Sequence, residues 1–115
     1  MVEVNVPSAW LRGILDLCLL ALVASGEAYG YELMRRLEGS GIGPVPGGSL
    51  YPALLRLEEQ GLLAADWRAG DGGPGRKYYA LTPEGRRQLD VEADTWRHFS
   101  GALQGLLTGV GAGTP

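Results

Sequence analysis

Residues 48–63 read GSLYPALLRLEEQGLL, a stretch that predicts one helix together with its end. We expect the helix to run from Ser49, acting as the N-cap, to Gln60, because a glycine follows at position 61. Pro52 then falls in the first turn, where a missing backbone N–H does little harm. The start and the end of this helix are therefore both set by local signals.

This predicted helix has two faces of different character. An advance of 100° per residue gathers leucines on one face (Leu50, Leu54 and Leu57) and small or polar side chains on another (Ser49, Pro52, Ala53, Arg56 and Gln60). Tyr51 lies on a flank of the apolar face. Such a helix packs on a core with one side and can enter a groove with the other.

Two strand-like runs follow and predict an antiparallel hairpin. Residues 62–68 (LLAADWR) and 76–82 (RKYYALT) are rich in aromatic and aliphatic side chains. Between them, residues 69–75 (AGDGGPG) have the composition of a loop. We therefore expect a short sheet with a glycine-rich tip and two bases, Arg76 and Lys77, at its root.

The last predicted helix opens with Thr82 as N-cap and Pro83 as its first residue, and is expected to end at about Leu107. Apolar side chains recur in it every seven residues (Leu89, Trp96, Leu103 and Val110), with Ala93, Phe99 and Leu106 between them. A seven-residue apolar repeat is a packing seam. We interpret it as a homodimer contact, the alternative being a helix folded back on its own domain.

Two more helices are predicted upstream. The segment from Ser8, as N-cap, to Ala24 is apolar on nearly every face, so one side needs the domain's own core and the other favours a second copy of the chain. Tyr29 to Glu38 forms a shorter helix with Leu33 and Leu37 inside, and with Arg35 and Arg36 outside.

The composition fits one domain with an uneven charge distribution. The chain has 115 residues, including 19 glycines, and a net charge of −3, which argues mildly against binding to nucleic acid. However, eight bases and six acids lie between Arg35 and Arg87, a balance of +2, and the acidic excess lies outside that window. Positive charge is therefore confined to the middle of the chain.

The lone cysteine, Cys18, lies in an apolar run and cannot form an intramolecular disulfide. We expect a buried structural thiol rather than a reactive one. The run is shorter than the roughly 18 residues of a membrane span, and no basic cluster precedes it. A cytoplasmic protein without a membrane association is therefore expected.

The order of these elements, and four stretches of sequence, resemble the PadR family of bacterial transcriptional regulators. The stretches are ILDLCLLAL (14–22), YGYELMRRLE (29–38), GSLYPALLRLEEQGLL (48–63) and GRKYYALTPEGRR (75–87). The resemblance runs from about Leu11 to Leu89, and the single last helix is similar to the shorter subfamily. One departure is Pro46-Gly47-Gly48, where members commonly show Ser-Pro-Gly.

The resemblance implies a mainly α fold with a small antiparallel β-hairpin. This is a winged helix-turn-helix with a C-terminal dimerisation helix. Residues 1–82 would form the DNA-binding domain, whose N-terminal helix joins the dimer interface. Residues 83–107 would be the dimerisation helix, and 108–115 a flexible tail.

The resemblance also implies a dimeric transcriptional repressor that binds DNA. Its third helix would lie in the major groove of a pseudo-palindromic operator, and its wing would reach the flanking backbone or minor groove. The implied DNA-facing residues are Tyr31, Ser49, Tyr51, Pro52 and Arg56, with Arg76 and Lys77 at the wing. For Arg56 the alternative is a solvated side chain paired with Glu59 or Gln60, and both tyrosines are equally consistent with core packing.

Some members of the resembled family hold flat aromatic ligands between tryptophans at the dimer centre. Here Trp96 is the candidate platform, with Phe99 and Trp10 as neighbours, and a planar aromatic compound or nucleotide is the expected effector. Plain core packing of Trp96 is the open alternative.

Other activities find little support in the sequence. Residues 70–77 (GDGGPGRK) look like a phosphate-binding loop but lack a following Ser or Thr, and a strand rather than a helix comes next. His98 has only Asp94 at ligand spacing. We therefore expect no enzyme, cofactor or metal site. The alternative function is a winged-helix module that binds protein instead of DNA.

Overall fold

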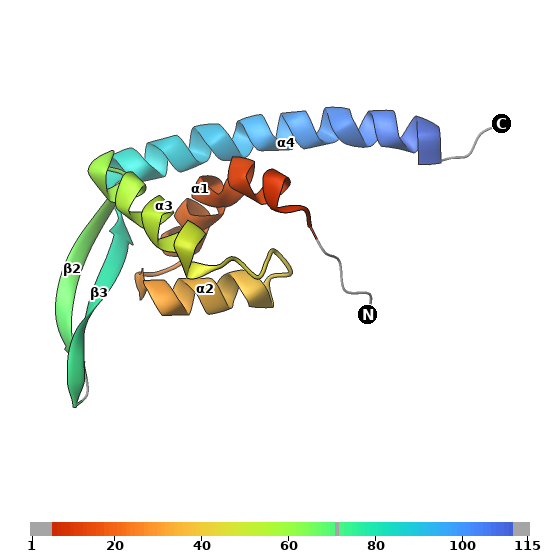
Figure 1. The fold of residues 1–115 in the computed structure, drawn as a ribbon. Helices are drawn as coiled ribbons and strands as arrows, with labels where there is room; N and C mark the ends of the chain where they lie inside the picture. Colours follow the sequence, from red (N-terminus) through yellow and green to blue (C-terminus); the bar gives the residue numbers. More distant parts are fainter. Residues whose placement is uncertain (1–5, 71, 112–115) are drawn as a thin grey trace.

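The computed structural model describes residues 6–70 and 72–111, which form four helices and three strands. The elements are α1 (Ser8–Ala24), β1 (Ala28–Tyr29), α2 (Gly30–Gly39), α3 (Gly47–Glu59), β2 (Leu63–Gly70), β3 (Gly73–Leu81) and α4 (Pro83–Gly111). Figure 1 shows α1, α2 and α3 gathered on one side of α4, with the β2–β3 hairpin extending away from them. The C-terminal part of α4 projects beyond this body.

The core is built mainly from leucines of the first three helices. Seven of them are almost completely buried, namely Leu19, Leu20, Leu33, Leu37, Leu50, Leu54 and Leu57, and Leu63 of β2 is buried with them. Tyr79 of β3 and Leu89 of α4 close the same cluster. The predicted inner faces of α2 and α3 are thus confirmed, since leucines three and four residues apart share one side of a helix.

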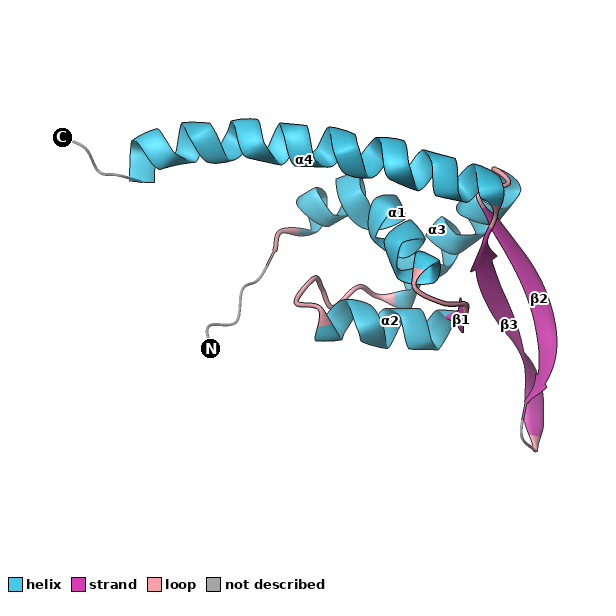
Figure 2. Cartoon of the chain, turned by 180° about the vertical axis from the view of Figure 1, so that it is seen from behind, coloured by secondary structure: helices cyan, strands magenta, loops and turns pink. Residues whose placement is uncertain are grey.

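The strands form one antiparallel sheet in the order β1–β3–β2. Leu63 pairs with Leu81 in the hairpin, and Tyr29 of β1 pairs with Tyr78. Figure 2 shows β1 as a short segment between α2 and the hairpin. The sequence did not predict β1, because two residues carry no periodicity of their own.

The hairpin is longer than predicted. Its strands continue to Gly70 and resume at Gly73, so most of residues 69–75 belong to strands instead of a loop. A glycine-rich composition was a poor guide here because the pairing of Arg68 with Arg76 and of Gly70 with Gly73 extends the ladder.

Helix α3 begins earlier than predicted, at Gly47, with Pro46 as its N-cap. The N–H groups of Ser49 and Leu50 donate to the Pro46 carbonyl, so Ser49 lies inside the first turn and caps nothing. Pro52 is therefore the sixth helical residue, not the third. Its missing N–H leaves the carbonyl of the exposed Gly48 to solvent.

The other helix ends show how far local signals reach. Thr82 caps α4 as predicted, since its Oγ1 accepts the Gly85 N–H at 2.9 Å. Gly61, with φ of 77°, follows α3 as predicted. By contrast, α1 has Pro7 and not Ser8 as its N-cap. Helix α4 continues past Leu107 to Gly111, so the predicted tail is helical over 108–111, and its last four residues lie outside the described chain.

No helix in residues 6–70 and 72–111 is both long and apolar enough to cross a membrane.

Candidate nucleic-acid interface

The exposed face of α3 is a row of four residues: Gly48, Pro52, Leu55 and Glu59. They recur at spacings of four, three and four, which places them in one line along the helix. The predicted second face differs from this row. Ala53 is buried, and Arg56 lies on the flank of the row, beside α1.

Arg56 is held by a carboxylate of α1. Its Nη2 donates to Asp16 Oδ1 at 2.6 Å and its Nε to Asp16 Oδ2 at 3.3 Å. This hydrogen bonding raises the pKa of the guanidinium above its ordinary value. The alternative partners named from the sequence, Glu59 and Gln60, are four residues or fewer away, whereas Asp16 is reached only through the tertiary fold.

Lys77 of the wing is held by α3 itself. Its Nζ lies 2.8 Å from Glu58 Oε1 and 5.6 Å from the centre of the Tyr79 ring. The hydrogen bond to Glu58 raises the pKa of the ammonium group. The pair therefore bridges the hairpin and α3.

Tyr51 is clamped between the first turns of two helices. A Cβ added to Gly30 would overlap its ring, and one added to Gly47 would lie 3.3 Å from Cε2. Tyr51 as a whole is 45% exposed. Both interpretations of this tyrosine thus hold in part: one side of the ring packs at the α2–α3 junction, and the rest is open to a partner.

The opposite face of the sheet carries stacked arginines and tyrosines. The Arg76 guanidinium lies 4.6 Å from the centre of the Tyr29 ring, which packs edge-on against Tyr78 at 5.5 Å. Arg68 covers Tyr78 at 4.5 Å and donates two hydrogen bonds to Glu27, at 2.7 and 2.8 Å. This stack fastens the wing to the start of α2.

The two neighbouring wing bases therefore point to opposite faces, as alternation along a strand requires. Lys77 faces α3 and Arg76 faces Tyr29. Within the described residues, no carboxylate oxygen lies within 4 Å of the Arg76 guanidinium, so Arg76 is the wing base most available to a phosphate.

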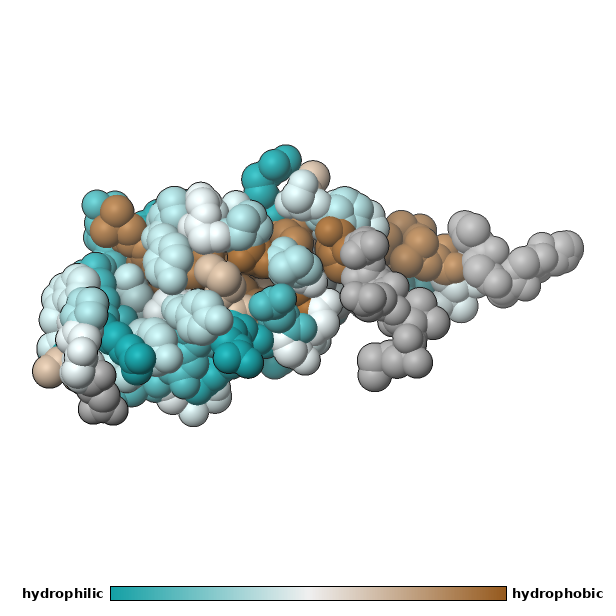
Figure 3. All heavy atoms as spheres, turned by 60° about the horizontal axis from the view of Figure 1, so that its bottom comes forward, coloured by the Kyte–Doolittle hydropathy of each residue, from teal (hydrophilic) through white to brown (hydrophobic). Residues whose placement is uncertain are grey.

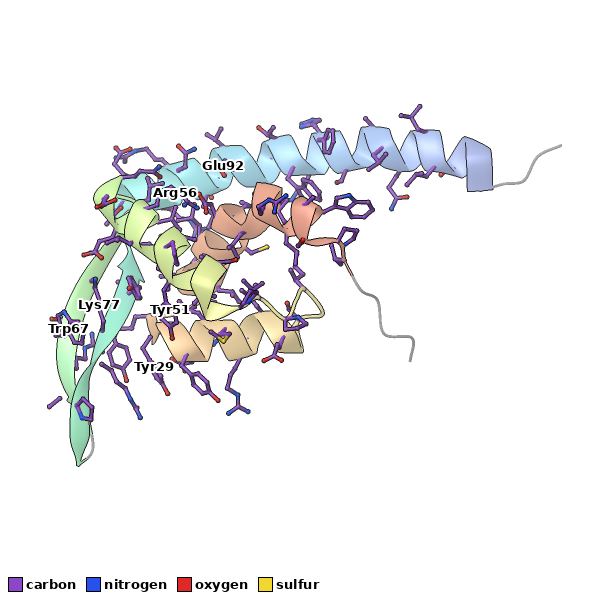
Figure 4. All side chains as sticks on the ribbon, viewed as in Figure 1. Tyr29, Tyr51, Arg56, Trp67, Lys77 and Glu92 are labelled. Carbon is purple, nitrogen blue, oxygen red and sulfur yellow. The ribbon has the colours of Figure 1, made fainter. Side chains whose placement is uncertain are left out.

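Tyr31 and Ser49 are both exposed, on the first turns of α2 and α3 respectively. The guanidinium of Arg35 lies 6.0 Å from the centre of the Tyr31 ring. Figure 4 labels Tyr29, Tyr51 and Lys77 on the side of the molecule where α2, α3 and the wing meet.

Trp67 is a candidate that sequence reasoning missed. It is 69% exposed and pairs directly with Lys77, so the two side chains share the face of the hairpin that continues the core. Strand alternation could have found it, because Leu63, Ala65 and Trp67 fall on one face.

The predicted effector residues are brought together only in part. The rings of Trp96 and Phe99 lie 5.8 Å apart and tilted by 46°. Trp10, on the first turn of α1, is exposed, and the described residues show no ring contact between it and either of the other two. A hollow of about 500 Å³ between α1, α3 and α4 is lined by none of the three.

The remaining reactive side chains have ordinary surroundings. Burial raises the pKa of the Cys18 thiol, which packs against the core and stays protonated at neutral pH. His98 is solvent-exposed, with Nδ1 3.7 Å from Asp94 Oδ2. Over the part of the chain that the structure describes, no three His, Cys, Asp or Glu side chains are placed to hold a metal ion.

Comparisons with known proteins agree with this arrangement. The sequence model of the family described as transcriptional regulator PadR-like matches residues 19–91 of this chain. The transcriptional regulator Rv3488 of Mycobacterium tuberculosis is 40% identical over 78 residues, covering 68% of this chain and 71% of that protein.

Two crystal structures of similar proteins extend the likeness to most of the chain. A PadR-like transcriptional regulator from Bacillus cereus has a TM-score of 0.79 and 38% identity, covering 88% of this chain and 98% of that one. A padr family transcriptional regulator from Eggerthella lenta has a TM-score of 0.77 and 39% identity, with coverages of 87% and 88%.

Proposed function

Because the chain belongs to the PadR-like family of transcriptional regulators, we propose that it represses transcription by binding operator DNA as a homodimer. The protein is a transcriptional regulator and not an enzyme. The observation that carries the proposal is the placement of α3 and the wing: α3 exposes one face beside a hairpin whose bases include Arg76, which has no carboxylate partner within the described residues.

The proposed contacts divide into two kinds. The groove-facing set is Tyr31, Ser49, Tyr51, Pro52 and Arg56, and the wing set is Arg76 and Lys77. Bases on a wing suit phosphates, which fix position, whereas side chains on an inserted helix meet base edges, which carry sequence. Arg76 is the strongest candidate for a phosphate contact because no internal ion pair must be broken first.

Internal pairing lowers the electrostatic attraction that the sequence suggests. Arg56 and Lys77 each hold a carboxylate within 3 Å, so each must exchange a partner to bind DNA. The side chains of Arg56 and Asp16 are 50% and 37% exposed, and such pairs are worth about 0–1 kcal/mol, so this exchange is feasible but contributes little net affinity. The Lys77–Glu58 pair is more buried, so releasing Lys77 costs more. We therefore expect tight binding only by the dimer and only at moderate salt.

The proposed dimer contact is the projecting part of α4. Phe99, Leu103, Leu106 and Leu107 are all exposed there, and Figure 3 shows apolar atoms over this part of the helix. Leu89, the first member of the seven-residue repeat, packs in its own domain's core instead. Two-fold symmetry would place operator half-sites about 34–36 Å apart, one turn of DNA.

An effector site at Trp96 and Phe99 is a further part of the proposal. The two rings are neighbours on the projecting helix, so a planar aromatic compound or nucleotide could stack there across a dimer axis. A variant keeping only Trp96 (Trp10→Phe with Trp67→Phe) should change its fluorescence during titration with planar cations, phenolic acids or nucleotides. An unchanged signal with all three would remove the effector site.

A mobility-shift series on the DNA upstream of the protein's own coding region tests the function. We expect specific binding that weakens steeply as the salt concentration rises from about 50 to about 200 mM, because salt competes with the phosphate contacts. Absence of binding at low salt would refute the repressor and favour the winged-helix module that binds protein, for which the net charge of −3 is the supporting observation.

A further inference from the structure

The middle of the exposed row on α3 is apolar. Leu55 is 50% exposed, and Pro52 precedes it by one turn on the same line. Gly48 adds no side chain at one end, and Glu59 stands at the other. None of the three side chains in this row donates a hydrogen bond when the glutamate is ionised.

Beside Leu55, the polar side chains on both flanks of this row are already engaged within the protein. On one flank Arg56 is bound to Asp16, and on the other Glu58 is bound to Lys77. The exposed Ser49 lies on the first turn, more than one turn before Leu55, and the Tyr51 ring packs against Gly30 and Gly47. The part of α3 that advances furthest outward is therefore a ridge of proline and leucine.

In the major groove, one base carries an apolar group at its edge: thymine, with its 5-methyl group. Guanine N7 and O6 and adenine N7 are acceptors that need a donor, and the amino groups of adenine and cytosine are donors that need an acceptor. The side chains of Pro52 and Leu55 offer neither. We propose that Leu55, supported by Pro52, reads thymine methyl groups in each operator half-site. This assignment rests on the proposed function, since it requires α3 to lie in the major groove.

Removing single methyl groups from the DNA tests the proposal. An operator is first selected from random duplexes with the full-length protein, and each thymine is then replaced singly by uracil, which lacks only the methyl group. Fluorescence anisotropy of labelled duplexes measures the dissociation constants. We expect about a fourfold loss at one or two positions in each half-site, the size expected for one buried methylene-sized group.

Protein variants then assign the contact to Leu55. Leu55→Ala should weaken binding to the thymine duplex and abolish the thymine-to-uracil difference at the same positions, whereas Leu55→Met should keep it. Arg35→Ala is the matched control on α2, expected to leave the thymine-to-uracil ratio unchanged. Because Leu55 lies on the surface, circular dichroism melting should show that all three variants remain folded.

The outcomes separate the two proposals. If the wild-type protein binds its selected duplex and no uracil substitution changes the dissociation constant, the thymine assignment is wrong and the DNA-binding function stands. If Leu55→Ala keeps the full thymine-to-uracil difference, another residue reads the methyl group. If no duplex is bound even at low salt, the proposed function itself fails.

Discussion

Arg56 on α3 and Asp16 on α1 are joined by two hydrogen bonds across 40 positions of sequence. The bond ties the helix proposed to meet DNA to the helix that packs beneath α4. The sequence did not indicate Asp16 as a partner, but in the fold the positive charge of Arg56 is paired with the Asp16 carboxylate. Whether Arg56 contributes to DNA binding depends on how readily it leaves Asp16.

Replacing Asp16 should release this arginine. We expect Asp16→Asn to strengthen DNA binding by roughly threefold to tenfold at low salt, because one guanidinium per subunit becomes available to the DNA. The cost in the free energy of unfolding should stay below about 1 kcal/mol, since both partners are partly exposed. Anisotropy titrations at several salt concentrations measure the change.

Asp94→Asn is the matched control, because it removes the same charge from α4, away from α3. Equal gains in affinity from both variants would mean that overall charge, and not the release of Arg56, controls binding.

Lys77 and its partner should act in opposite directions. Lys77→Ala is expected to weaken binding to all sequences alike and to flatten the slope of log affinity against log salt by about 0.9 per lost contact. Glu58→Gln should strengthen binding, because the substitution frees the Lys77 ammonium group, which now lies 2.8 Å from the Glu58 carboxylate. A change in sequence preference with Lys77→Ala would show that Lys77 contacts bases.

The Glu27–Arg68 pair should make stability depend on pH in the acidic range. Hydrogen bonding from Arg68 lowers the pKa of Glu27 below its ordinary value of 4.5. A lowered folded-state pKa contributes stability that is present above the unfolded pKa and is lost as pH falls through the folded one. Comparing Arg68→Met with the wild type, we expect a stability deficit at pH 7 that shrinks below about pH 4.

Urea denaturation at both pH values measures that difference, and NMR titration of the Glu27 carboxyl should show its pKa rising in the variant. A deficit that is the same at pH 7 and pH 3 would assign it to the stacking of Arg68 on Tyr78 instead.

Two glycines of α4 should respond in opposite ways to alanine. A Cβ on Gly85 would overlap the carbonyl oxygen of Leu62, a backbone atom that cannot move aside. Gly85→Ala should therefore cost about 1–3 kcal/mol of unfolding free energy. A Cβ on Gly101 would meet nothing within 4 Å, so Gly101→Ala should stabilise the helix by up to about 1 kcal/mol. Thermal denaturation of both variants compares them, and a Gly85→Ala protein as stable as the wild type would contradict the packing of α4 against the turn between α3 and β2.

The sequence alone determined the type and order of the larger elements. Leucines at helical spacing marked α2 and α3, and two runs rich in aromatic and aliphatic residues marked the hairpin. Thr82 and Gly61 marked two helix ends. These signals are local: each depends on residues within a turn or two of chain, which is the range over which backbone geometry and capping act.

Only the tertiary structure decided which side chains remain available. It paired Arg56 with Asp16 and Lys77 with Glu58. It packed the Tyr51 ring between two glycines and left Leu55 exposed on the outward ridge of α3. It also added β1, which exists only because β3 offers it an edge. A partner chosen across tens of residues leaves no periodic trace in the sequence, because it depends on how helices and strands pack and not on the spacing within any one of them.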